Sequence, residues 1–88
     1  MENYVLKFEE NSMIELSQVS KDKTVLIKQI NAQPSLKKRL FSLGLSVGKE
    51  ITVSETSLQK NTIKIALGFS SVALRLDEAK AIVVEMAS

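Results

Sequence analysis

The stretch that decides the fold runs from Arg39 to Gly48 and reads RLFSLGLSVG. It has the pattern of a helix that ends and a chain that turns toward a strand. Leu36, Leu40 and Leu43 recur at spacings of four and three, which predicts one apolar helical face. Gly44 follows at once, where a helix ends in a left-handed residue that glycine adopts without steric cost. The sequence therefore predicts a short helix that stops at Gly44.

Strand patterns lie on both sides of this helix. The segment before it, residues 24–30 (TVLIKQI), is rich in β-branched residues, but its alternation is imperfect and leaves the buried face open. Pro34 then suits the first turn of a helix, because its missing N–H is not needed there. Residues 49–55 alternate cleanly between apolar and polar side chains, as in a half-buried strand. Further strands are expected at 63–67, 72–76 and 82–85.

Turn and cap signals separate these segments. Asn61 is the residue of the turn at 59–62 best able to take a positive φ. Asp77 is expected to cap a short helical turn before the last strand. Met13 to Val19 looks like an anchoring turn. Residues 1–12 form an N-terminal extension, read as a tail or a short edge strand.

Length and element count bound the fold class. A chain of 88 residues makes one domain, assigned here to residues 13–88 behind the extension. The elements are about five short strands, one inserted helix and one helical turn. Short strands joined by tight turns around one core favour a small β-barrel that is closed or nearly closed. The fold class is therefore mainly β.

Composition excludes several kinds of function. The chain has no cysteine and no histidine, so it cannot form a disulfide, a thiolate nucleophile or a histidine base. It also lacks a nucleophile elbow and a phosphate-binding glycine loop. With 12 basic and 10 acidic residues, its net charge of +2 does not by itself indicate a polyanion partner. We therefore expect a protein that is not an enzyme.

A second signature, ALRLDEAKAIVV at residues 73–84, completes a family pattern. Together with RLFSLGLSVG and the strands between them, it resembles the FeoA family, ferrous iron transport protein A. The resemblance implies an SH3-like β-barrel with a helix inserted after the first strand. It also implies a cytoplasmic protein that binds and regulates FeoB, a membrane ferrous iron transporter with a cytosolic GTP-binding region. Similar domains occur at the C-terminus of metal-dependent transcription repressors.

The resemblance does not by itself supply a metal site. The candidate carboxylates are the pairs Glu9 and Glu10, in the extension, and Asp77 and Glu78. We interpret Asp77 as the cap and Glu78 as a first-turn acid favoured by the helix dipole. The chain lacks the ligands for a tight ferrous site, so we expect no metal site and no cofactor.

Surface contact with a partner is the remaining mode of action, and we expect the contacting residues around the end of the helix. The expected partner-binding residues are Lys38, Arg39, Phe41, Leu43, Leu45, Val47 and Arg75. Lys37, Lys38 and Arg39 form a basic cluster that fits a solvated helix face, docking onto an acidic partner or phosphate contact. Phe41 lies at the margin of the apolar stripe, where it suits the core, the favoured reading, or a contact surface with Leu45 and Val47. Arg75 either lies along the barrel wall or pairs with a carboxylate.

Two functions from different classes follow. The first is a non-enzymatic interaction module that regulates a FeoB-type transporter. The alternative is a nucleic-acid-associated small barrel, or a detached SH3-like domain of a metal-dependent repressor, which would bind heparin with a steep salt dependence. No nucleic acid is expected under the first hypothesis. Free strand edges also leave pairing of two copies open.

Overall fold

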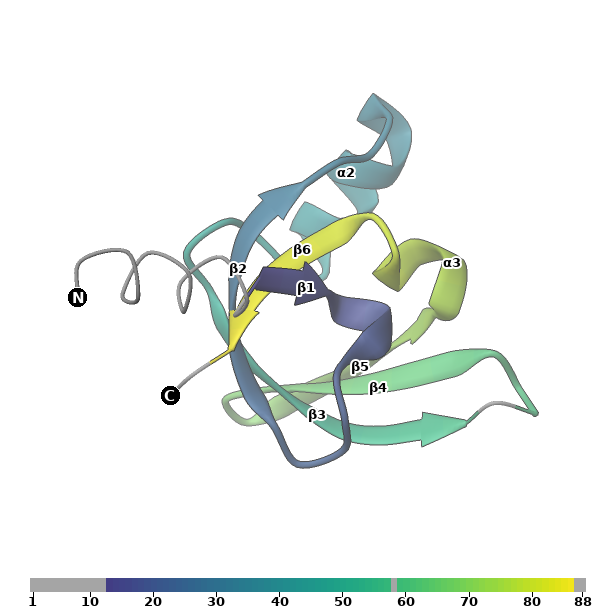
Figure 1. Ribbon diagram of the computed structural model, residues 1–88. Coiled ribbons are helices and arrows are strands. Elements are labelled where there is room, and N and C mark those ends of the chain that lie inside the picture. The colour runs from purple at the N-terminus through teal and green to yellow at the C-terminus, as the bar shows by residue number, and fades with distance from the viewer. Residues whose placement is uncertain (1–12, 58, 87–88) are drawn as a thin grey trace, which may run out of the picture.

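The computed structural model describes residues 13–57 and 59–86, which fold into one antiparallel sheet with short helical segments (Figure 1). The fold is mainly β, as the sequence predicts. Along the chain the elements are β1 (Met13–Glu15), the 3₁₀ turn η1 (Leu16–Gln18), β2 (Thr24–Ile30), α2 (Pro34–Ser42), β3 (Glu50–Ser57), β4 (Thr62–Leu67), β5 (Ser70–Arg75), α3 (Leu76–Ala79) and β6 (Ile82–Met86).

The strand order in the sheet is β1-β6-β2-β3-β4-β5, and every neighbouring pair is antiparallel. The structure has six strands in its described part, where the sequence suggested about five. The additional strand is β1, from the segment read as an anchoring turn, and η1 supplies that turn directly after it.

The sheet is strongly curved, but β1 and β5 do not pair with each other, so backbone hydrogen bonds do not close it. The short helix α3 packs against both β5 and η1. This is the SH3-like arrangement that the resemblance implied.

The imperfect alternation in β2 has a structural cause. Its register against β6 shifts between Ile27 and Gln29, so the strand contains a bulge at Lys28. Val25 and Ile27 face the core before the bulge, whereas Lys28 and Gln29 are both exposed. A bulge adds one residue to one strand and bends it, which shifts the side-chain pattern out of period.

The core lies inside the curved sheet and takes side chains from most of its strands. Each large aliphatic side chain that is fully buried stabilises the fold by about 1.5–3 kcal/mol relative to exposure. Val53, Ile65 and Leu74 have no more than 1% of their surface exposed. The buried residues are Leu16, Val19, Val25, Ile27, Leu40, Leu45, Ile51, Val53, Ile63, Ile65, Leu74, Ala79, Ile82 and Val84.

The predicted cap at Asp77 is wrong, because α3 begins at Leu76, two residues earlier than a cap at Asp77 would place its start. Arg75 therefore occupies the capping position. Its backbone N–H donates to Oε1 of Glu78 at 3.0 Å. The carboxylate that reaches back is three residues beyond the cap, which is the reach of an acidic side chain in the first helical turn. The prediction for Asn61 is confirmed, with φ of 54°.

Candidate interaction surface

The end of α2 is fixed by a pair of backbone hydrogen bonds that surround Gly44. The N–H of Gly44 donates to the carbonyl of Phe41, and the N–H of Leu45 donates to that of Leu40, both at 3.0 Å. Gly44 has φ of 95°. This is the Schellman termination, in which the residue after the glycine folds back onto the last turn. Leu40 and Leu45 are both fully buried as a result.

That termination corrects two sequence-based expectations. Leu45 was expected in an apolar contact surface, but its side chain belongs to the core. Phe41 was assigned to the core by preference, and that placement is wrong, because 71% of its surface is exposed. The bonds around Gly44 turn Leu45 inward beside Leu40, while Phe41 lies about 100° around the helix from Leu40 and faces outward. The aromatic side chain is therefore available at the surface.

A groove of about 420 Å³ lies between α2 and the end of β2. Phe41 borders it from the helix and Val47 from the loop after the helix, and buried Leu45 contributes to its lining. The loop is held against β2 by two bonds, from Gly48 N–H to the Ile27 carbonyl at 2.8 Å and from Ile27 N–H to the Lys49 carbonyl at 2.9 Å. The main chain on both sides of the groove therefore belongs to the hydrogen-bonded scaffold.

The groove combines apolar anchors with positive charge. Val47 is 63% exposed, so it and Phe41 are two of the large apolar side chains that the protein leaves in solvent. Lys37 reaches the groove from α2 and Lys28 from the β2 bulge. Nζ of Lys28 is 3.6 Å from Oε1 of Glu85, a loose surface pair. An exposed aromatic beside basic side chains suits binding of an apolar side chain with a carboxylate nearby.

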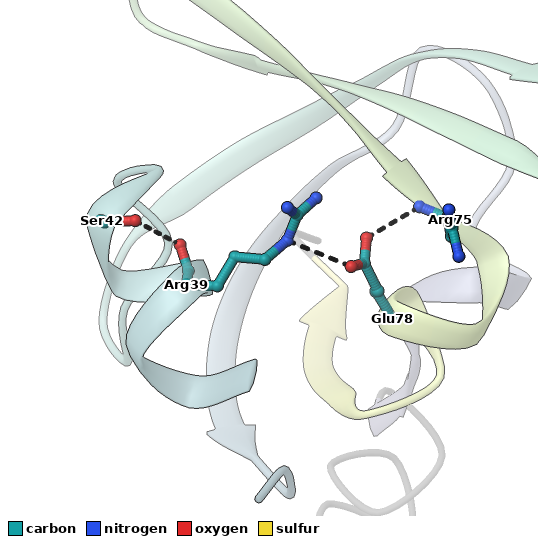
Figure 2. Close-up of polar contacts among 4 residues, drawn as sticks. All are labelled: Arg39, Ser42, Arg75 and Glu78. Carbon is teal, nitrogen blue, oxygen red and sulfur yellow. Dashed lines mark hydrogen bonds and ion pairs between the residues drawn. The ribbon is translucent and has the colours of Figure 1, made fainter. Parts of the chain in front are cut away.

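On another side of α2, an ion pair ties the helix to α3 (Figure 2). Nε of Arg39 lies 3.2 Å from Oε2 of Glu78, whose side chain is only 16% exposed. The same carboxylate accepts the Arg75 N–H through its other oxygen. Ser42 Oγ donates to the Arg39 carbonyl at 2.7 Å. Arg39 is therefore engaged within the chain.

The predicted partner-binding residues do not form one surface. Phe41 and Val47 border the groove, and Leu45 lines it from the core. Leu43 is half-buried in a separate depression with Gly44 and Leu67, and Arg75 lies in a cleft beside α3. Lys38 is exposed on α2. Their role in binding a partner stays a prediction.

The sequence-based prediction of partner contacts missed the end of β2, where Lys28 and Gln29 line the groove. The signal that could have found them was the broken alternation of β2, which marks a bulge. It also missed Phe69, which is fully exposed at the turn between β4 and β5.

Two further observations bear on the kind of site. Among residues 13–57 and 59–86, no three acidic, histidine or cysteine side chains come together where they could hold a metal ion. Glu9 and Glu10 lie outside the described residues, as does the whole extension at 1–12. No helix in the described part of the chain is long and apolar enough to span a bilayer.

Comparison with known proteins decides the family. The model of the FeoA domain matches residues 14–86. This chain belongs to the FeoA family. A Helicobacter pylori J99 protein, provisionally named Fe(2+) transport protein A, is 37% identical over 71 residues, which cover 80% of this chain and 91% of the relative. A Campylobacter jejuni protein with the same provisional name is also 37% identical over 71 residues, covering 81% and 96%.

Solved structures agree with the fold. The FeoA-like protein of Clostridium acetobutylicum superposes with a TM-score of 0.77 at 26% identity, covering 88% of this chain and 90% of that one. A manganese-dependent transcriptional repressor superposes with a TM-score of 0.80 at 22% identity, over 85% of this chain and 42% of the repressor. At that identity the second likeness shows a shared fold only.

Proposed function

We propose that this chain is a non-enzymatic accessory protein of ferrous iron uptake in the cytoplasm. It acts by binding the cytosolic GTP-binding region of a FeoB-type transporter. Membership of the FeoA family and the names of its relatives support the iron-uptake role. The observation that carries the mode of action is the groove bordered by Phe41 and Val47, which are 71% and 63% exposed.

The proposed contact places an apolar side chain of the transporter in the groove. Exposed aromatic residues bordering a concave surface supply a large share of binding energy in many interfaces. Lys37 and Lys28 lie at the same groove and select a partner with a carboxylate beside that side chain. Backbone hydrogen bonds hold the loop after α2 against β2, so little ordering entropy is lost on binding.

Regulation follows from differential affinity. If the groove binds one nucleotide state of the transporter more tightly than another, binding shifts the transporter toward that state. A tenfold preference corresponds to about 1.4 kcal/mol. The chain then changes transport without performing a reaction, and it needs no cofactor.

The test is a calorimetric titration of the full chain into the transporter's soluble GTP-binding domain. The titration is run without nucleotide, with GDP and with a non-hydrolysable GTP analogue. We expect binding in at least one state, and we expect Phe41→Ala to weaken it about tenfold or more. The matched control is Phe69→Ala, which removes an exposed aromatic outside the groove and should leave binding unchanged. Absence of heat in all three states, or an equal loss from both variants, contradicts the proposal.

A further inference from the structure

A second concave surface lies beside α3 and is polar. This cleft, of about 470 Å³, is lined by the turn before β4 and by the residues that open α3. Strand pairing brings the two segments together. Thr62 pairs with Arg75 in the register of β4 and β5, and the N–H of Leu76 donates to the carbonyl of Asn61 at 2.9 Å. The backbone therefore sets the position of the cleft.

Positive charge gathers at this cleft. Lys60, Arg75 and Lys80 line it, and Asp77 is its one acidic lining residue. Three positive side chains against one negative leave an excess of two, as large as the formal net charge of the whole chain. Within the described residues the ion pairs are Lys28 with Glu85 and Arg39 with Glu78, so none of the three cations has a carboxylate partner there.

The neighbouring acid Glu78 does not neutralise the cleft. One of its oxygens pairs with Nε of Arg39 and the other accepts the backbone N–H of Arg75. In Figure 2 the dashed contact from Glu78 runs to the main-chain nitrogen of Arg75 and not to its guanidinium group. Neither of these contacts of Glu78 involves the guanidinium group of Arg75.

We propose that this cleft binds an acidic peptide segment of a protein partner. The planar guanidinium of Arg75 can hold a carboxylate through two parallel hydrogen bonds, and the two lysines attract a second carboxylate. Half-buried Leu76 gives the cleft an apolar patch for the peptide's aliphatic atoms.

No aromatic side chain lines the cleft, which disfavours single-stranded nucleic acid, since that ligand relies on base stacking. Asp77 repels every anion, and it repels a dianionic phosphate more strongly than a single carboxylate. The inference does not depend on the proposed function, because this cleft and the Phe41 groove share no lining residue.

The experiment is a titration of the full chain, followed by the ¹H–¹⁵N amide NMR spectrum. The probe is blocked hexaglutamate, with blocked hexaglutamine as the uncharged control. We expect hexaglutamate to shift the amide signals of Asn61, Thr62, Leu76 and Lys80 in a salt-dependent way, and hexaglutamine to shift none of them. Shifts spread equally over every lysine-bearing surface overturn the proposal.

Two substitutions with opposite expected effects on hexaglutamate binding sharpen the test. Arg75→Gln should weaken hexaglutamate binding about threefold to fivefold, the upper part of the range for one exposed charge pair. Asp77→Asn should strengthen it about twofold, because it removes the one repulsive charge. Lys21→Gln is the matched control for loss of a surface cation and should leave binding unchanged. All three sites are exposed, and the amide spectrum itself reports whether each variant is folded.

Separate titrations with inorganic phosphate and with hexathymidylate address the other anions. If either probe shifts the same signals at least as tightly as hexaglutamate, the acidic-peptide assignment is overturned. Equal effects of Arg75→Gln and Lys21→Gln overturn it as well.

Discussion

The groove at α2 and the cleft at α3 are concave surfaces of similar size built in different ways. The groove includes the buried core residue Leu45 and is bordered by exposed apolar side chains. The cleft has only half-buried Leu76 as its apolar component, and its other lining residues are polar or charged. The first surface is therefore coupled to the stability of the fold, and the second is governed by charge. Substitutions at the two sites should separate these properties.

The largest effect is expected from shortening the buried side chain that lines the groove. Leu45→Ala leaves a cavity in the core and should reduce the free energy of unfolding by about 2–5 kcal/mol. The matched substitution in the cleft, Leu76→Ala, removes a half-buried side chain and should cost roughly 1–2 kcal/mol. Urea denaturation of both variants measures the difference. Equal costs would contradict the distinction between the two surfaces.

The helix termination beside the groove should be the next most sensitive feature. Gly44 has φ of 95°, a conformation that side chains with a Cβ rarely adopt. Gly44→Ala should therefore destabilise the protein by about 1–2 kcal/mol. The added Cβ would lie 3.5 Å from Cδ1 of Leu67, an ordinary contact, so the cost comes from the backbone and not from crowding. If the thermal midpoint of Gly44→Ala equals that of the parent protein, a Cβ at residue 44 does not strain the helix termination, which contradicts this prediction.

A smaller effect is expected from the ion pair between α2 and α3. Glu78→Gln keeps an oxygen that can accept the Arg75 N–H but removes the charge opposite Arg39. It should cost roughly 0.5–1 kcal/mol at low salt and less at high salt. Glu85→Gln is the control, since its pair with Lys28 is longer, at 3.6 Å, and the Glu85 side chain is more exposed than that of Glu78. Denaturant midpoints at two salt concentrations test this, and a larger loss from Glu85→Gln would contradict it.

The smallest effect on stability is expected at the groove's aromatic border. Phe41 is 71% exposed, so Phe41→Ala should change the free energy of unfolding by no more than about 0.5 kcal/mol. Chemical denaturation checks this value. A loss above 2 kcal/mol would show that the side chain packs into the core after all.

Local sequence patterns predicted much of the fold, because helix ends, strand alternation and turn conformations depend on neighbouring residues. The helix end at Gly44, the alternation around Ile51 and Val53, and the positive φ of Asn61 each depend on a few neighbouring residues. The strand β1 was missed because three residues do not show a period. The cap was misplaced by two residues, at Asp77 instead of Arg75, because no local pattern fixes where α3 begins.

The candidate surfaces were harder to predict because they depend on contacts between distant segments. The burial of Leu45 follows from how the helix termination packs against the sheet, and the outward position of Phe41 follows with it. Gln29 is exposed beside Lys28 because β2 contains a bulge there, and both residues line the groove. Lys60 comes close to Arg75 through the pairing of β4 with β5, which the sequence of either segment alone does not reveal, whereas α3 places Lys80 at the same cleft.

We propose that a FeoB-type transporter binds this chain in the groove between α2 and β2. The most direct measurement is the ¹H–¹⁵N amide spectrum of this chain during titration with the unlabelled soluble domain of the transporter, in each nucleotide state. We predict that the largest shifts fall on the groove, at residues 28–31, 41 and 45–47. An unchanged spectrum in every state, or shifts confined to surfaces away from the groove, would contradict the claim.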